Sequence, residues 1–96
     1  MNFEYYFDYD IQSTHLEKHS VSEAEIFEFF TDIQYIERPR SDNSFEAIGK
    51  LESGRYLRVA YRKKAKDLYF IITAYDIEDK ELISFFEDFL DHESNK

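Results

Sequence analysis

Residues 44–75 read SFEAIGKLESGRYLRVAYRKKAKDLYFIITAY and contain three segments that look like consecutive antiparallel strands joined by two short polar connections. In the middle segment, Leu57, Val59 and Tyr61 alternate with other residues, which is typical of a strand that buries one face. Residues 68–74 are almost wholly apolar, which is typical of a central strand. This stretch therefore predicts most of an antiparallel sheet.

The flanking residues carry further strand and helix patterns. Alternation with a period of two predicts strands over residues 1–9 and 32–39. Apolar spacing and capping residues predict a short helix ending near His19, a second helix after the N-cap Ser22, and a third after Asp76. Strands in a run, with helices at both ends of the run, are typical of the α+β class.

The order of these segments predicts one domain over residues 1–96. We expect a small antiparallel β-sheet of four to five strands, with two helices in the N-terminal half and one C-terminal helix. Ten phenylalanines and eight tyrosines supply enough apolar area for a small core. Residues 92–96 are expected to form a frayed tail.

The composition also bounds the location of the protein. There is no cysteine, which excludes a disulfide framework and a thiolate zinc site. No apolar stretch approaches the length of a membrane span. The acidic, alternating start lacks the basic end and the continuous apolar run of a signal peptide. We therefore expect a soluble, cytoplasmic protein that does not bind membranes.

Charge is distributed unevenly along the chain, whose net charge is −9. Residues 1–37 contain nine acids and one base, and residues 67–96 contain nine acids and two bases. Residues 38–66 instead contain nine bases and three acids. A basic centre between acidic ends indicates a local surface that attracts an anionic ligand. The alternative is that helix surfaces are acidic by chance and the basic centre is a solvated hairpin.

Four pieces of the chain, taken in their order and spacing, resemble a known family: FDYD at residues 7–10, EKHSVSEAE at 17–25, AIGKLESGRYLRVAY at 47–61 and IITAYD at 71–76. The chain resembles the BrnT family, the toxin half of a bacterial type II toxin–antitoxin system. The resemblance implies a compact RelE-like fold, ribonuclease activity and a tightly bound antitoxin. Two positions depart from the family pattern: Ser20 replaces a glycine, and Tyr75 stands where the family tends to have an arginine.

Metal-independent cleavage of RNA needs a base for the 2′-hydroxyl, an acid for the leaving 5′-oxygen and cations for the charge on phosphorus. Histidine, arginine and tyrosine can supply these groups, and the predicted catalytic residues are Arg55, Arg62, His19, Tyr75 and Tyr61. The predicted RNA-binding residues are Arg58, Lys63, Lys64 and Lys66. The prediction includes a cleft on the sheet lined by Arg55, Arg62 and Tyr75, with His19 near.

Each of these residues also has a purely structural explanation. A histidine at a helix C-terminus interacts with the helix dipole, and arginines on a strand protect a sheet edge. Lysines in a turn are solvated, and a buried tyrosine fills the core. His15 and His19 are four residues apart, but no third ligand accompanies them. We therefore expect neither a metal nor a cofactor.

Two functions follow from these observations. The first is an endoribonuclease toxin whose partners are RNA and a cognate antitoxin protein. The second is a non-catalytic, toxin-like binding module that pairs with a partner protein or with itself. The basic centre and the breadth of the resemblance favour the first, whereas the overall acidity and the replacement of an arginine by Tyr75 favour the second.

Overall fold

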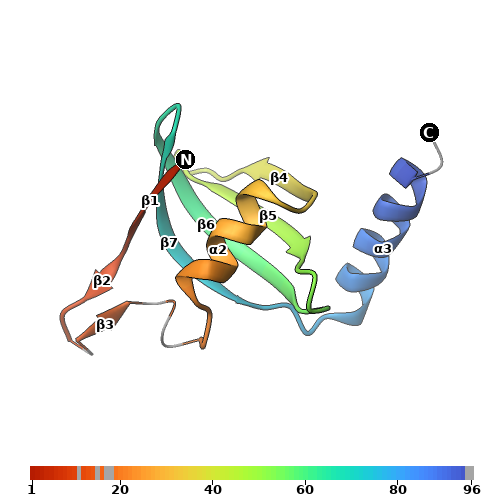
Figure 1. The fold of residues 1–96 in the computed structure, drawn as a ribbon, viewed down its shortest axis with the longest axis horizontal. Coiled ribbons are helices and arrows are strands. Elements are labelled where there is room, and N and C mark those ends of the chain that lie inside the picture. Colours follow the sequence, from red (N-terminus) through yellow and green to blue (C-terminus); the bar gives the residue numbers. More distant parts are fainter. Residues whose placement is uncertain (11, 15, 17–18, 95–96) are drawn as a thin grey trace.

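The computed structural model describes residues 1–10, 12–14, 16 and 19–94, and shows a curved sheet with helices beside it (Figure 1). The elements in chain order are β1 (Asn2–Tyr5), β2 (Phe7–Asp8), β3 (Ser13–Thr14), α2 (Glu23–Thr31), β4 (Tyr35–Pro39), β5 (Phe45–Lys50), β6 (Tyr56–Ala65), β7 (Leu68–Asp76) and α3 (Lys80–Ser94). The last helix therefore extends into the predicted tail. Neither helix of the described residues is long and apolar enough to cross a membrane.

Five strands form one mixed sheet in the order β1-β7-β6-β5-β4. Pairing is antiparallel from β4 to β7, but β1 runs parallel to β7, with Asn2 beside Leu68 and Tyr5 beside Ile71. The predicted all-antiparallel sheet is therefore wrong. Alternation with a period of two identifies a strand such as β1, but it does not identify its neighbour or its direction. Pro39, which cannot donate a ladder bond, ends the edge strand β4 as predicted.

The predicted helix ending near His19 is wrong at its start, although Leu16 is helical. Ser13 and Thr14 form β3, which pairs with β2 in a separate two-stranded sheet. Residues 15, 17 and 18 of that prediction lie outside the described residues. The described chain thus forms two helices rather than the three that the sequence predicts. A helix this short has little stability of its own, and tertiary pairing decides its conformation.

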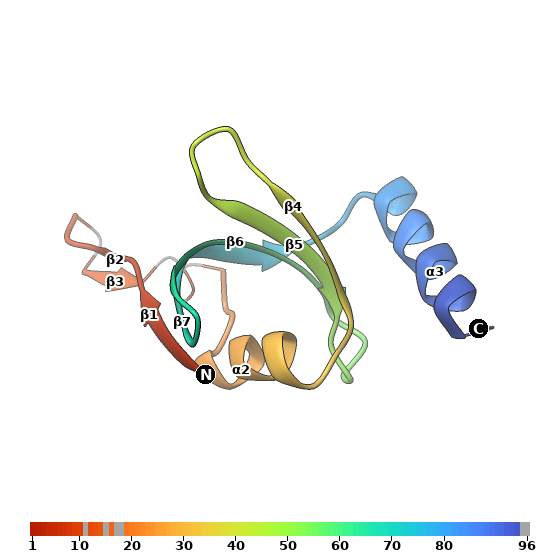
Figure 2. The ribbon, with the colours of Figure 1, turned by 90° about the horizontal axis from the view of Figure 1, so that it is seen from above.

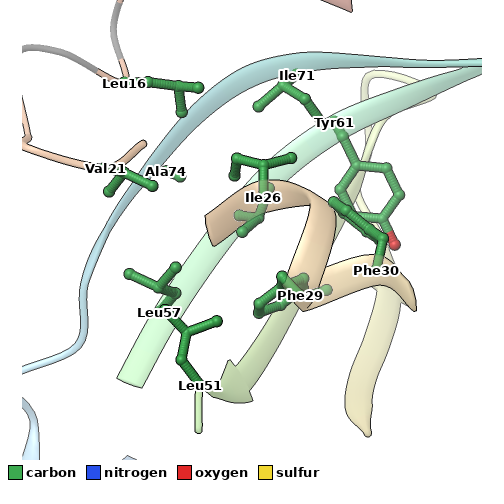
Figure 3. Close-up of a cluster of buried hydrophobic side chains, with 12 residues drawn as sticks. Leu16, Val21, Ile26, Phe29, Phe30, Leu51, Leu57, Tyr61, Ile71 and Ala74 are labelled. Atoms are coloured by element: carbon green, nitrogen blue, oxygen red, sulfur yellow. The ribbon is translucent and has the colours of Figure 1, made fainter. Parts of the chain in front are cut away.

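Helix α2 begins at a complete capping box and covers one face of the sheet. The Ser22 side chain accepts a hydrogen bond from Glu25 N at 3.1 Å, and Glu25 Oε1 accepts one from Ser22 N at 2.9 Å. Ile26, Phe29 and Phe30 are buried, as their spacing predicts (Figure 3). Burial of such side chains contributes roughly 1.5–3 kcal/mol each, so this stripe fixes the helix on the sheet.

Alternate residues of β6 lie beneath α2. Leu57, Val59 and Tyr61 are fully buried there, which confirms the predicted parity of this strand. The ring of Tyr61 lies 4.8 Å from that of Phe30 in an edge-to-face contact (Figure 3). The intervening residues Arg58 and Arg62 therefore belong to the opposite face.

Helix α3 lies on a different side of the sheet from α2 (Figure 2). Leu82 and Phe85 of this helix, together with Ile48 and Arg58 of the sheet, contribute to the walls of a small cavity of about 110 Å³. The part of the sheet around Arg62 opens into a second, larger hollow, which none of the described helix residues lines. The face opposite α2 is consequently available for a ligand over part of its area.

Gly49 is required for the packing of α2. A Cβ atom at this position would lie 2.8 Å from Phe29 Cε2 and 3.0 Å from Ile33 Cδ1. Phe29 is fully buried, so its ring has no free space into which to move. We expect Gly49→Ala to lower the free energy of unfolding by about 1–2 kcal/mol, as measured by urea denaturation. A variant as stable as the wild type would contradict this tight fit.

Candidate functional site

Arg55, which directly precedes β6, is saturated by contacts within the protein. Its Nε and Nη2 donate to the two carboxylate oxygens of Asp76 at 2.5 and 3.1 Å, and its Nη1 donates to both oxygens of Glu25 at 3.0 Å. The same guanidinium donates to the backbone carbonyls of Ser20 at 2.9 Å and His19 at 3.1 Å. Arg55 thus joins four segments of the chain, and it has no edge left for a phosphate. The structure thus shows that the Arg55 guanidinium holds these segments together.

These contacts shift the pKa values of the partners. The hydrogen bond from Arg55 lowers the pKa of Asp76 below its ordinary value of 3.8. Burial alone would raise the pKa of Glu25, but hydrogen bonds from Ser22 and Arg55 outweigh this effect and leave it below 4.5. Both carboxyl groups are consequently ionised at neutral pH, as the cluster requires.

We expect the stability of the protein to fall in acid through this cluster. Glu25 and Asp76 have lower pKa values in the folded chain than their ordinary values of 4.5 and 3.8. Their contribution is therefore fully present above those values and is lost as the pH falls through the folded pKa values. Urea denaturation at pH 7, 5, 4 and 3 should show a decline below about pH 4.5, and the decline should be shallower in Arg55→Ala. Equal slopes in the two proteins would contradict this assignment.

The carbonyls that Arg55 binds belong to a strained turn before α2. Ser20 has a φ of +56°, in the left-handed region that favours glycine. This is the position at which the BrnT pattern has a glycine. The hydrogen bonds from Arg55 hold this turn in place, and the turn positions the side chain of His19.

His19, Tyr75 and Arg58 come together at the end of β6 and β7, and we call these three residues the reaction cluster. The ring centroids of His19 and Tyr75 lie 5.7 Å apart. Arg58 is directly opposite Tyr75 in the strand register, and its Nη1 lies 3.4 Å from the Tyr75 hydroxyl. The cluster therefore combines an imidazole, a phenol and a guanidinium.

Arg58 also retains an unused hydrogen-bond donor. Its Nε is buried and has no hydrogen-bond partner among the described residues, and the nearest carboxylate oxygen, from Glu46, is 4.0 Å away. The hydrogen bond to Tyr75 is the main cause of a raised Arg58 pKa, which keeps the guanidinium charged. A buried donor without a partner is unusual in a folded protein.

Arg62 lies apart from the reaction cluster, in an open hollow of about 540 Å³ that we call the basic hollow. The hollow is lined by Tyr6, Arg40, Asp42, Arg62, Lys64, Phe70 and Ile72. Arg40 and Arg62 make no ion pair with the described residues, whereas Lys64 pairs with Glu4 at 2.7 Å. The hollow thus presents two guanidinium groups beside the half-buried side chains of Phe70 and Ile72.

The remaining predicted residues lie elsewhere. Tyr61 is fully buried, and its hydroxyl donates to Glu37, so it cannot contact RNA in this structure. Burial is the main cause of its raised pKa. Lys63 Nζ donates to the same carboxylate at 2.7 Å and lies 4.3 Å from the centre of the Phe45 ring. Lys66 is exposed in the connection between β6 and β7. The three residues predicted to line one cleft are therefore not brought together: Arg62 lines the basic hollow, whereas Arg55 binds Asp76 and the backbone of His19 beside Tyr75.

Five residues of the basic hollow were missed by reasoning from the sequence: Tyr6, Arg40, Asp42, Phe70 and Ile72. Arg40 and Asp42 belong to a segment that predicts only a turn, although Arg40 is one of the nine bases of residues 38–66. Phe70 lies in a strand so uniformly apolar that its pattern does not separate the two faces. The available signal was therefore the charge of Arg40 alone.

Comparison with protein-family models, with curated proteins and with solved structures finds no match to this chain. The structure shows the class of the protein, which is a small α+β protein with a five-stranded mixed sheet.

Proposed function

We propose that this protein is a metal-independent endoribonuclease, a toxin of the BrnT type that acts on RNA in the cytoplasm and is neutralised by a cognate antitoxin. The meeting of His19, Tyr75 and Arg58 where β6 begins and β7 ends is the observation that carries this proposal. These three side chains supply the base, the acid and the cation that the reaction needs.

In the proposed reaction, the neutral imidazole of His19 takes the proton of a 2′-hydroxyl, and that oxygen attacks the adjacent phosphorus. The P–O5′ bond breaks as the P–O2′ bond forms, and Tyr75 gives its proton to the leaving O5′. The products are a 2′,3′-cyclic phosphate and a 5′-hydroxyl. His19 and Tyr75 then return to their first state by exchanging protons with water, while Arg58 stabilises the charge on the phosphate oxygens throughout.

The two departures from the BrnT pattern fit this proposal. Tyr75 replaces an arginine, but it contacts Arg58, so a guanidinium is still present at this end of the strands. Ser20 replaces a glycine, and its backbone keeps the left-handed conformation that a glycine would favour. Both substitutions are therefore compatible with retention of a site here.

The test is cleavage of a fluorescently labelled single-stranded RNA by the purified protein in the presence of EDTA. We expect fragments that end in a 2′,3′-cyclic phosphate, and we expect induced expression to arrest growth unless the antitoxin is also expressed. Normal growth together with intact RNA would overturn the proposal. Binding of RNA without cleavage would instead assign the alternative function, a non-catalytic binding module.

A further inference from the structure

The basic hollow lies on the same strand as the reaction cluster but at a distance from it. Arg58 and Arg62 are four residues apart on β6, which at about 3.3 Å per residue separates their Cα atoms by about 13 Å. A group bound in the hollow therefore does not occupy the position of the scissile phosphate. The volume of about 540 Å³ falls within the range of roughly 300–1,000 Å³ that is usual for small-molecule sites.

We propose that the basic hollow is a separate subsite that holds one unpaired nucleotide of single-stranded RNA. This inference deepens the proposed function, on which it rests for the identity of the polymer. Arg40 and Arg62 would bind the phosphates on either side of the nucleotide, because a guanidinium offers paired N–H donors that match phosphate oxygens. Both arginines are without an ion-pair partner among the described residues, so binding breaks no ion pair in that part of the protein.

The apolar wall of the hollow identifies the nucleotide as unpaired. Phe70 and Ile72 of β7 line the hollow beside the arginines, and Tyr6 completes this side. Aromatic side chains bind nucleic acid by stacking on the faces of bases. In a duplex those faces are already stacked on one another, so only a single strand can offer one to Phe70.

Asp42 gives the hollow a preference among bases. Ser44, which is buried, holds the Asp42 carboxylate through its backbone N–H at 3.1 Å and through its hydroxyl. A carboxylate repels phosphate, so the part of the nucleotide next to Asp42 is the base. An ionised carboxylate accepts hydrogen bonds but donates none. Guanine offers two adjacent N–H donors on its Watson–Crick edge. We therefore expect guanosine to bind better than uridine.

The experiment measures fluorescence anisotropy with 2′-O-methyl RNA octamers, which cannot be cleaved through a 2′-hydroxyl. The first probe is all uridine, the second has one central guanosine, and the third is the second annealed to its complement. We expect Arg62→Ala, Arg40→Ala and Phe70→Leu each to weaken binding of the second probe about tenfold. Lys80→Ala, which removes one exposed charge from α3, should change it less than twofold.

Two further comparisons complete the test: the duplex against the single strand, and the probe with guanosine against the probe of uridine alone. The duplex should bind at least tenfold more weakly than the single strand. Asp42→Asn should remove the preference for guanosine. A duplex that binds as tightly as the single strand, or a Lys80→Ala loss equal to that of Arg62→Ala, would overturn the subsite. An Asp42→Asn variant that strengthens binding of both single strands equally would overturn the base preference.

Failure of this proposal is distinguishable from failure of the proposed function. Selective binding of the octamers without cleavage of ordinary RNA would leave the subsite standing and overturn the ribonuclease. Cleavage of ordinary RNA that is unaffected by Arg62→Ala and Phe70→Leu would leave the ribonuclease standing and overturn the subsite. Circular dichroism of each variant would establish that it is folded before its binding is compared.

Discussion

Arg55→Ala is expected to lower the free energy of unfolding by about 2–4 kcal/mol. The substitution leaves the carboxylates of Glu25 and Asp76 facing each other without a cation, and it removes donors from the carbonyls of His19 and Ser20. The Arg55 side chain is 23% exposed, so water replaces part of what is lost. The expected effect is therefore smaller than that of a fully buried ion pair.

Arg38→Ala provides the matched control. Arg38 forms an ion pair with Glu46 at 2.5 Å, but its side chain is 72% exposed, and such pairs contribute only about 0–1 kcal/mol. Both variants would be unfolded in urea at pH 7 and followed by circular dichroism. If Arg55→Ala lost no more stability than Arg38→Ala, the structural role of Arg55 would be disproved. If the protein is the toxin that we propose, loss of toxicity in Arg55→Ala would by the same reasoning report unfolding rather than lost chemistry.

Local patterns in the sequence predict the parts of the fold that local physics determines. The capping box of Ser22 and Glu25 and the buried stripe of α2 depend on residues three and four positions apart. The parity of β6 likewise follows from its own alternation. The parallel pairing of β1 with β7 joins residues more than 60 positions apart, and no local pattern encodes that choice of neighbour.

The same limit applies to the site. Arg55 has the right chemistry for a phosphate, yet its two carboxylate partners lie 30 and 21 residues away in the chain, so only the fold reveals that it is occupied. The contact between His19 and Tyr75 depends on the left-handed turn at Ser20, and a serine in the sequence does not indicate a left-handed backbone. Residue types could therefore be selected from the sequence, but their grouping required the structure.

His19→Ala and Tyr75→Phe are each expected to reduce the rate of RNA cleavage by about 10²-fold or more. Each removes one proton-transfer group from the reaction cluster and leaves the fold intact. His19 binds Arg55 only through its backbone carbonyl, which the alanine retains, and phenylalanine keeps the ring of Tyr75.

Tyr9→Phe serves as the control for Tyr75→Phe, because it removes the same hydroxyl from a side chain that is 83% exposed in the turn between β2 and β3. The single-turnover rate of cleavage is measured for the wild type, the two single variants and Tyr9→Phe, after urea denaturation has shown that their stabilities are equal. This comparison separates chemistry from folding. Since base and acid act in one step, the double variant His19→Ala/Tyr75→Phe should lose much less than the product of the two single losses. Wild-type rates in both single variants would place the reaction elsewhere on the protein, because a cluster that lacks its base or its acid cannot cleave RNA by the proposed step.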